Sequence, residues 1–382
     1  MRSRLNSLFD AMLPVFATLA ALGVGMIMLL ILRVNPAEAY GALWEGAFGS
    51  TNAIAETLVK ATPLLLVGLG ICIAFRANVI NIGGEGQMII GGILATQVGL
   101  TFTDLPGWLV IILAIVAGFI GGAIWGGIPG ILKAYFQVNE ILSTVMMNAI
   151  AVQLMNFLLR GPMIDPEQLE KASKIPQTAR LLEAFRLPRL VPTRLHIGFL
   201  IALVLAIVVY FLLWRTTLGY RIRAVGQNPH ASRYGGIRVR RRMVTALLLS
   251  GAFAGLAGAI QVYGVNYRMI TDGSASGFTG AAGFNGIVAA LFGQLHPIGT
   301  IPASICFGAL LVGANKMQRV VQIPSALITA LNGLVVVFVV SSEIWRRRRQ
   351  KQRLALARKA EKEGDGPPLH EEPSSAEEVT ES

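Results

Sequence analysis

The feature that most limits the fold of this chain is a succession of apolar runs, each long enough to cross a lipid bilayer. A hydrocarbon core of about 30 Å takes around 20 apolar residues as α-helix, and only helices and closed barrels satisfy their own backbone hydrogen bonds in lipid. The sequence is 54% hydrophobic with a mean hydropathy of +0.61, above the roughly 45–50% apolar content of a soluble domain. We therefore predict an all-α, polytopic integral membrane protein.

Ten transmembrane helices are expected, in a membrane domain over 1–344. They cover residues 14–32, 59–75, 86–103, 109–132, 139–160, 197–214, 243–264, 279–294, 298–315 and 323–344. The first run resembles a signal peptide, because Ala37-Glu38-Ala39 follows it like a cleavage site. Its apolar core exceeds the roughly 7–15 residues of a signal sequence, so we expect an uncleaved anchor.

Basic residues indicate which ends of the spans face the cytoplasm. Eight arginines and no acidic residue lie in the loop over 215–242, and four consecutive arginines follow Trp345. Cytoplasmic loops collect such residues, and ten spans place both termini on the side of this loop. We expect a multi-pass protein of a bacterial cytoplasmic (inner) membrane with both termini inside, an external loop over 161–196, and a disordered charged cytoplasmic tail over 345–382.

A glycine-rich motif, NIGGEGQ over 81–87, lies between two apolar runs. Three glycines in four positions favour a break in the helix, and a charge at membrane depth must be paired or hydrated. Irregular backbone in the membrane is tolerated where it lines a cavity, so Asn81, Glu85 and Gln87 are candidates for the substrate pathway. The alternative is an ordinary cytoplasmic turn after Arg76.

A second glycine-rich stretch, GFTGAAGFNGIVAALFG over 277–293, repeats this pattern later in the chain. Two such interruptions are typical of transporters built from two pseudo-repeats. Phe284 and Asn285 would suit a ring or sugar face, although small residues also serve plain helix packing. Asn148 in the fifth span could bind a polar solute or a neighbouring helix. The candidate substrate-pathway residues are thus Asn81, Glu85, Gln87, Asn148, Phe284 and Asn285.

The loop over 215–242 contains a short helix with both ends specified. Asn228 suits the N-cap, Pro229 the first helical position and Gly235 the C-cap. A two-turn helix is marginal unless it docks on something, either a partner protein or lipid headgroups. The candidate docking residues are Gly226, Asn228, Pro229, Ala231, Arg233, Tyr234, Gly235 and Gly236.

Catalytic chemistry finds little support in the sequence. The only acidic residue over 197–342 is Asp272, and the four histidines are scattered, so we expect no metal site and no catalytic residues. The chain also has no Gly-Lys dipeptide and therefore no phosphate-binding loop of the GxxxxGK[ST] type. An ATP-driven transporter would need a separate ATPase.

Four motifs carry a family resemblance: NIGGEGQ, VNEILSTVMMN, RAVGQNPHASRYGGI and GFNGIVAALFGQLHPIG. Together, over about 60–340, they resemble the permease subunits of ATP-binding-cassette importers for nucleosides and simple sugars, in the branched-chain-type permease superfamily. The resemblance implies a second homologous permease subunit, an external solute-binding lipoprotein, and a cytoplasmic ATPase that uses ATP and Mg. It also implies that residues 228–235 form the coupling helix. The chain would bind no cofactor itself, would not be an enzyme, and would have no nucleic-acid partner.

The alternative function is an ion-coupled secondary transporter of a small polar solute. A proton-coupled carrier needs ionisable side chains at membrane depth, which are scarce here. A sodium-coupled carrier could use backbone carbonyls instead, so the sequence leaves it open. Transport that persists without ATP would distinguish such a carrier from an ATP-driven permease.

Overall fold

The computed structural model describes residues 19–171 and 174–324, with scattered positions between 330 and 341. This part of the chain is helical and contains no strand, and isolated bridges join Gln177 to Ile270 and Arg189 to His196. A helix over Leu19–Ile31 comes first. It is followed by α2 (Pro36–Phe48), α3 (Thr51–Arg76), α4 (Gly84–Thr101), α5 (Gly107–Phe136), α6 (Glu140–Arg160), α7 (Pro166–Leu169), η1 (Glu183–Phe185), α8 (Gly198–Arg215), α9 (Thr217–Gln227), α10 (Pro229–Tyr234), α11 (Val239–Gln261), η2 (Val262–Asn266), α12 (Ala275–Thr279), α13 (Ala282–Phe292) and α14 (Pro297–Val321).

Six described helices are long and apolar enough to cross a membrane: α3, α5, α6, α8, α11 with its extension η2, and α14. They confirm the helical membrane class. α4, which carries Glu85 and Gln87 in its first turn, is not among them. Most of the tenth expected span, over 323–344, and all of the tail over 345–382 lie outside the described residues.

The span expected over 279–294 is instead a short helix after a sharp break. Gly280 (φ 61°) and Ala281 (φ 60°) both adopt the left-handed conformation and separate α12 from α13. α13 has 11 residues, or about 17 Å at 1.5 Å per residue, roughly half of a bilayer core. The second glycine-rich stretch therefore interrupts the helical path, as the sequence predicts.

The helix α2 is absent from our expectations. Asn35 caps it by accepting a hydrogen bond from Ala37 N (3.0 Å), and Pro36 occupies its first position. It packs on α14, with an ion pair between Glu45 and Lys316 (2.8 Å). α3 likewise begins at Thr51, capped by Ser50, rather than at residue 59.

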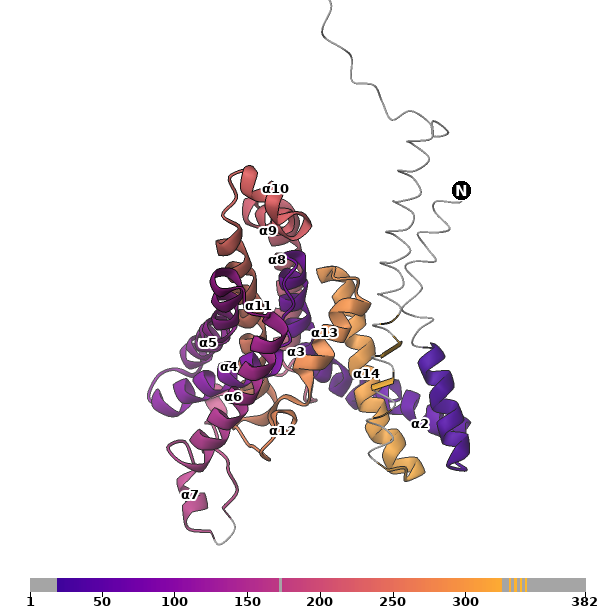
Figure 1. Cartoon of the computed structure of the whole chain (residues 1–382). Coiled ribbons are helices and arrows are strands. Elements are labelled where there is room, and N and C mark those ends of the chain that lie inside the picture. Colours follow the sequence, from indigo (N-terminus) through magenta and orange to yellow (C-terminus); the bar gives the residue numbers. More distant parts are fainter. Residues whose placement is uncertain are drawn as a thin grey trace, which may run out of the picture.

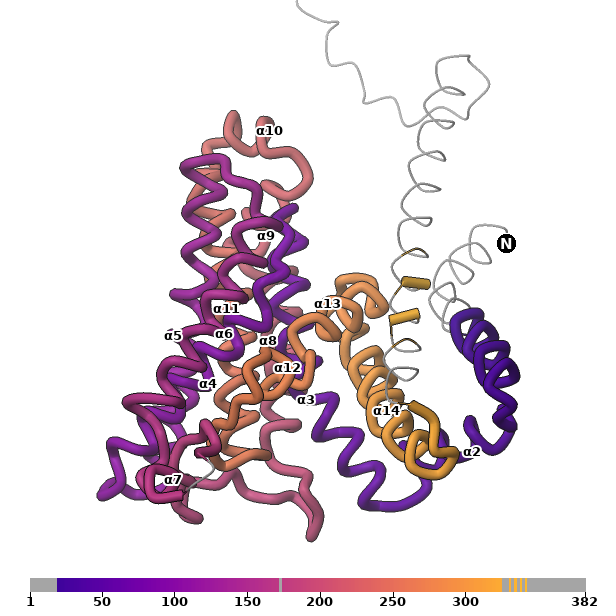
Figure 2. Tube along the Cα trace, turned by 60° about the horizontal axis from the view of Figure 1, so that its bottom comes forward, coloured from indigo at the N-terminus to yellow at the C-terminus, as the bar shows by residue number. Residues whose placement is uncertain are grey.

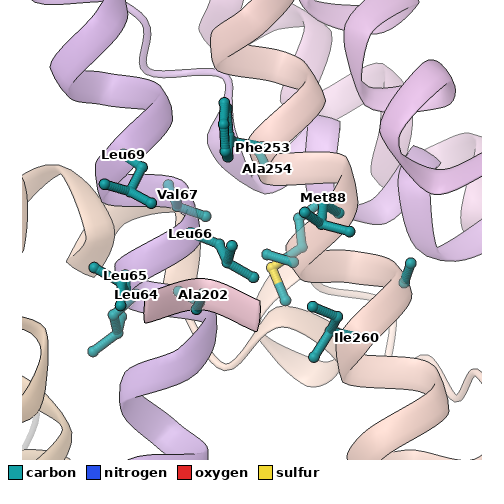
Figure 3. Close-up of a cluster of buried hydrophobic side chains, with 14 of the residues drawn as sticks. Leu64, Leu65, Leu66, Val67, Leu69, Met88, Ala202, Phe253, Ala254 and Ile260 are labelled. Carbon is teal, nitrogen blue, oxygen red and sulfur yellow. The ribbon is translucent and has the colours of Figure 1, made fainter. Parts of the chain in front are cut away.

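The core surrounds α3, which packs against α11 and α14 (Figure 1). Leu64 to Leu69 of this helix meet Met88, Phe253 and Ile260 in a cluster of buried apolar side chains (Figure 3). Helices α4, α5 and α11 approach through glycines instead of large side chains. A Cβ on Gly122 of α5 would overlap the Gly251 carbonyl oxygen of α11. Such close backbone approach is the usual way that helices associate in lipid.

The two ends of the molecule carry different elements. Figure 1 and Figure 2 show α10 at one end, α7 at the other, and α13 between these ends.

The loop over 161–196 is ordered in its described part, because its backbone pairs with the segment after η2, as in Leu181 N to Tyr267 O (2.9 Å). The guanidinium of Arg186 lies 4.7 Å from the Tyr267 ring centroid.

Candidate functional site

The NIGGEGQ motif forms a buried junction at the start of α4. The break is confined to residues 77–83, since Gly84 and Gly86 belong to the first helical turn, which corrects the expectation that all three glycines break the helix. Asn81, Glu85 and Gln87 are 1%, 3% and 1% exposed. The segment that follows Arg76 is thus buried inside the molecule at these three side chains.

The Asn81 and Gln87 amides bind each other. Asn81 Nδ2 donates to Gln87 Oε1 (3.0 Å), and Gln87 Nε2 donates back to Asn81 Oδ1 (3.1 Å). Asn81 Nδ2 also donates to Ser250 Oγ on α11 (2.8 Å), and Asn81 Oδ1 accepts from Gly83 N (2.9 Å). Four polar contacts satisfy two buried amides, as buried polar groups require.

Asn148 of α6 supplies the cap that the start of α4 lacks in its own sequence. Its Oδ1 accepts from Gly86 N (2.8 Å) and its Nδ2 donates to Ile82 O (2.9 Å). These bonds satisfy backbone groups that a helix terminus and an irregular segment leave unpaired. In this structure Asn148 joins two helices, which is one of the two roles the sequence allowed.

Glu85 joins α4 to the start of α13. Its Oε1 accepts a hydrogen bond from Phe284 N (3.1 Å), whereas its Oε2 has no hydrogen-bond partner among the described residues. The two helices touch through their backbones here, and a Cβ on Gly84 would stand 3.2 Å from Gly283 Cα. The two glycine-rich motifs, 199 residues apart, therefore meet at one point inside the molecule.

Phe284 differs from the other candidates because its side chain is 53% exposed. Asn285 beside it is half-buried, and its side-chain amide makes no hydrogen bond with the described residues. Of the six pathway candidates, the four on α4, its preceding loop and α6 make internal hydrogen bonds, and all of these except the half-buried Asn148 are buried. The two on α13 keep groups available to a ligand.

The predicted short helix is present as α10, Pro229–Tyr234, and both of its ends are capped. Asn228 Oδ1 accepts from Ala231 N (3.0 Å). At the other end Ile237 N bonds Ser232 O (2.9 Å) and Gly236 N bonds Arg233 O (3.1 Å), the pattern of a Schellman motif. Gly235 is the C-cap at φ −74°, so the left-handed residue is Gly236, at φ +77°.

The outer surface of α10 is free within the described chain. Tyr234 is 94% exposed, and Ala231, Arg233, Gly235 and Gly236 are exposed as well. A groove of about 640 Å³ runs beside it, lined by Arg233, Arg238, Arg240 and Arg241 among others. This end of the molecule presents a compact, basic docking element.

Comparison with known families decides the class of the protein. A family model described as "Branched-chain amino acid transport system / permease component" matches residues 53–340. The chain belongs to this family of permeases. It is the permease subunit of an ATP-binding-cassette importer and a multi-pass membrane protein. Such importers work with an ATPase and a solute-binding protein.

Individual relatives cover nearly the whole permease. It is 38% identical over 331 residues to the guanosine ABC transporter permease protein NupP of Bacillus subtilis, covering 87% of this chain and 93% of that protein. It is 33% identical over 347 residues to the glucose ABC transporter permease protein TsgB13 of Haloferax volcanii, covering 88% of each. It is 30% identical over 338 residues to the nucleoside ABC transporter permease protein NupB of Lactococcus lactis, covering 87% and 92%. No solved structure matches the chain.

The structure also brings out a residue of the permease that the sequence marks only as the basic residue ahead of the glycine-rich motif. Arg76, the last residue of α3, donates from Nη2 to Leu295 O (3.2 Å), just beyond α13. Its guanidinium also lies 5.1 Å from the Trp214 ring centroid on α8. A basic side chain in the last turn of an apolar helix was the available signal, but its partners lie far away in sequence.

Gly226 of α9 rests against the same helix end. A Cβ there would overlap the Arg76 carbonyl oxygen and stand 2.9 Å from the Arg76 carbonyl carbon and 3.1 Å from that of Ala77. The loop that carries α10 is therefore seated directly on the end of α3. No group of three or more metal-ligating side chains occurs within the described residues of the permease.

Proposed function

We propose that this permease translocates a nucleoside or a related sugar-containing solute across the cytoplasmic membrane of a bacterium. The observation that carries the proposal is the similarity, over 87% of the chain, to permeases named for guanosine and for nucleosides. The exposed ring of Phe284 and the half-buried amide of Asn285 support it. An aromatic face and an amide together suit a base or a sugar ring.

The assembly we propose contains four kinds of subunit or component. This chain pairs with a second homologous permease, a cytoplasmic ATPase hydrolyses ATP with Mg, and an external lipoprotein delivers the solute. The chain itself has ten spans in two pseudo-repeats, with α12 and α13 together counted as one interrupted span, and keeps both termini in the cytoplasm. Eight arginines over 215–242 support this orientation.

In the proposed mechanism α10 is the element that the ATPase grips. Its caps make it a rigid two-turn helix, and its exposed residues Arg233 and Tyr234 offer charge and aromatic surface to a partner. When the ATPase closes on ATP, α10 and α9 move together. The contact between Gly226 of α9 and the end of α3 transmits this displacement to the membrane domain. Alternating access then follows from movement of the interrupted helices.

The pathway runs past the start of α13 in this proposal. Phe284 and Asn285 face the solute, whereas Asn81, Glu85, Gln87 and Asn148 hold the junction that positions them. The internal bonds of the last four residues support this division. Asn81, Gln87 and Asn148 would then affect transport by shaping the junction at the start of α13, more than by touching the solute.

The test is uptake by proteoliposomes that contain the two permeases and their ATPase, with the solute-binding protein added outside. Labelled guanosine should accumulate only when ATP is supplied, and Phe284→Ala should reduce uptake more than it reduces assembly of the complex. Uptake of labelled glucose is measured in the same proteoliposomes, as the competing candidate solute. Accumulation of solute without ATP, driven by an ion gradient, would contradict the proposal and favour the ion-coupled carrier.

A further inference from the structure

The short helix α13 is held at both of its ends by residues that flank one loop. At its start, Phe284 N donates to Glu85 Oε1 on α4 (3.1 Å). Just past its end, Leu295 O accepts from Arg76 Nη2 on α3 (3.2 Å). Arg76 and Glu85 stand on either side of the segment 77–83. Two side chains close together in sequence thus span the length of a helix from the other half of the chain.

The chemistry at the start of α13 matches the polarity of a helix. A helix begins with unpaired N–H groups and positive potential, and it ends with unpaired C=O groups and negative potential. A carboxyl oxygen accepts at the start of α13, and a guanidinium donates beyond its end.

Close packing joins the body of α13 to α3 as well. A Cβ on Gly286 would stand 2.7 Å from Val67 Cβ, and a Cβ on Gly68 would stand 3.3 Å from Gly286 O. At such distances the two helices cannot slide independently without opening a gap. Displacement of the α3 end therefore acts on α13 through both its sides and its termini.

The same α3 end is in contact with the docking loop. Gly226 of α9 rests on the Arg76 backbone, and the Trp214 ring receives the guanidinium of Arg76 at 5.1 Å and that of Arg223 of α9 at 5.8 Å. The Trp214 ring also lies 5.0 Å from the ring of His296, which precedes α14. A continuous set of contacts thus runs from α9 through Arg76 to the corner between α13 and α14.

From these contacts we infer that Arg76 and Glu85 make α13 follow the docking loop, so that movement of α9 changes the exposure of Phe284. Arg76 and Glu85 are positioning residues, since they act through α13. The inference rests on the proposed function for the part in which an ATPase moves α10. It goes further by naming the two side chains that carry this movement to the pathway.

The experiment follows two cysteine reporters in the complete transporter in nanodiscs. Phe284→Cys reports on α13, and Tyr234→Cys, at a 94% exposed position on α10, reports on the docking helix. The buried Cys72 stays, and Cys306, which is half-buried, is changed to serine in every variant. The rate of maleimide labelling is measured without nucleotide and with ATP plus vanadate.

In the parent protein both reporters should change their labelling rate with nucleotide. Arg76→Met and Glu85→Leu should abolish the change at position 284 while keeping it at position 234. Glu85→Gln should behave like the parent, because Gln retains an oxygen that accepts from Phe284 N. If Arg76 or Glu85 had a purely structural role, its substitution would lower the melting temperature. The nucleotide response of the labelling rate would then be affected alike at positions 234 and 284.

Other outcomes have a definite meaning. Full nucleotide dependence at position 284 in both Arg76→Met and Glu85→Leu would overturn the inference while leaving the proposed function intact. If neither reporter responds to nucleotide in the parent, the result counts against the proposed function. If position 234 responds and position 284 does not, the inference is overturned. If Arg76→Met does not fold, Arg76→Lys replaces it. Lys keeps the charge but lacks the planar fork of Arg, so it should give a reduced response at position 284, and a parental response would again overturn the inference.

Discussion

Replacing Gly226 with alanine should weaken coupling more than the same change at either glycine that follows α10. The structure gives each glycine a different physical situation. A Cβ on Gly226 would overlap the Arg76 carbonyl oxygen, with backbone atoms of Arg76 and Ala77 at 2.9 and 3.1 Å, so no flexible side chain can yield. At Gly235 the nearest atoms are 3.6 Å away, and at Gly236 there is open space but φ is +77°.

The expected magnitudes follow from these situations. Overpacking against backbone costs about 1–3 kcal/mol, which would reduce the population of the seated loop by roughly 5–150-fold. A left-handed conformation costs an L-residue roughly 1–2 kcal/mol, so Gly236→Ala should have an intermediate effect. Gly235, at φ −74° with ordinary contacts, should accept alanine with little change.

The assay is solute uptake together with ATP hydrolysis in proteoliposomes that contain the whole transporter. Gly226→Ala should lower the solute moved per ATP, and Gly235→Ala is the matched control in the same loop. Equal uptake by Gly226→Ala and the parent, or a larger loss in Gly235→Ala, would refute the reasoning that the contact with α3 transmits movement.

Three further predictions concern stability in detergent, measured by thermal unfolding. Gly122→Leu should destabilise the protein by about 1–3 kcal/mol or more, because its side chain would enter the backbone of α11, whereas Gly41→Leu should be nearly neutral because nothing lies within 4 Å. Asn81→Ala and Gln87→Ala should each cost about 1–3 kcal/mol, and the double variant should cost less than their sum, because each single change strands the other amide. Burial lowers the pKa of the His196 imidazole to about 4 from 6.5, so stability should be complete above pH 6.5 and decline as the pH falls toward 4, and His196→Asn should remove part of this decline.

Local features of the fold could be predicted from the sequence because their causes are local. Asn228, Pro229 and the following glycines specify α10 within a few residues, and the structure confirms both of its caps. Asn139 likewise caps α6, with Ile141 N donating to its Oδ1 (2.9 Å). The same reasoning could have found α2, since Asn35 and Pro36 form an equivalent start signal. A prediction based on long apolar runs misses this helix, which has only 13 residues.

Long-range contacts could not be predicted in this way. Arg76 meets Leu295 across 219 residues, and Glu85 meets Phe284 across 199. Nothing in the neighbouring sequence specifies either partner, because each contact depends on how α3 and α13 pack. The glycine patterns predicted two interruptions, but packing alone determines that the interruptions touch.

The burial of the polar candidates changes which positions should determine the solute. Buried polar groups in lipid need internal partners, and the buried amides of Asn81 and Gln87 bond each other. The half-buried amide of Asn148 bonds the backbone of Ile82 and Gly86. Amides that already have hydrogen-bond partners gain little from a passing solute. The exposed ring of Phe284 and the Asn285 amide, which has no hydrogen-bond partner among the described residues, gain contacts with it. Solute preference should therefore depend on Phe284 and Asn285, and substitutions at the start of α4 should change the amount of working transporter more than its choice of solute.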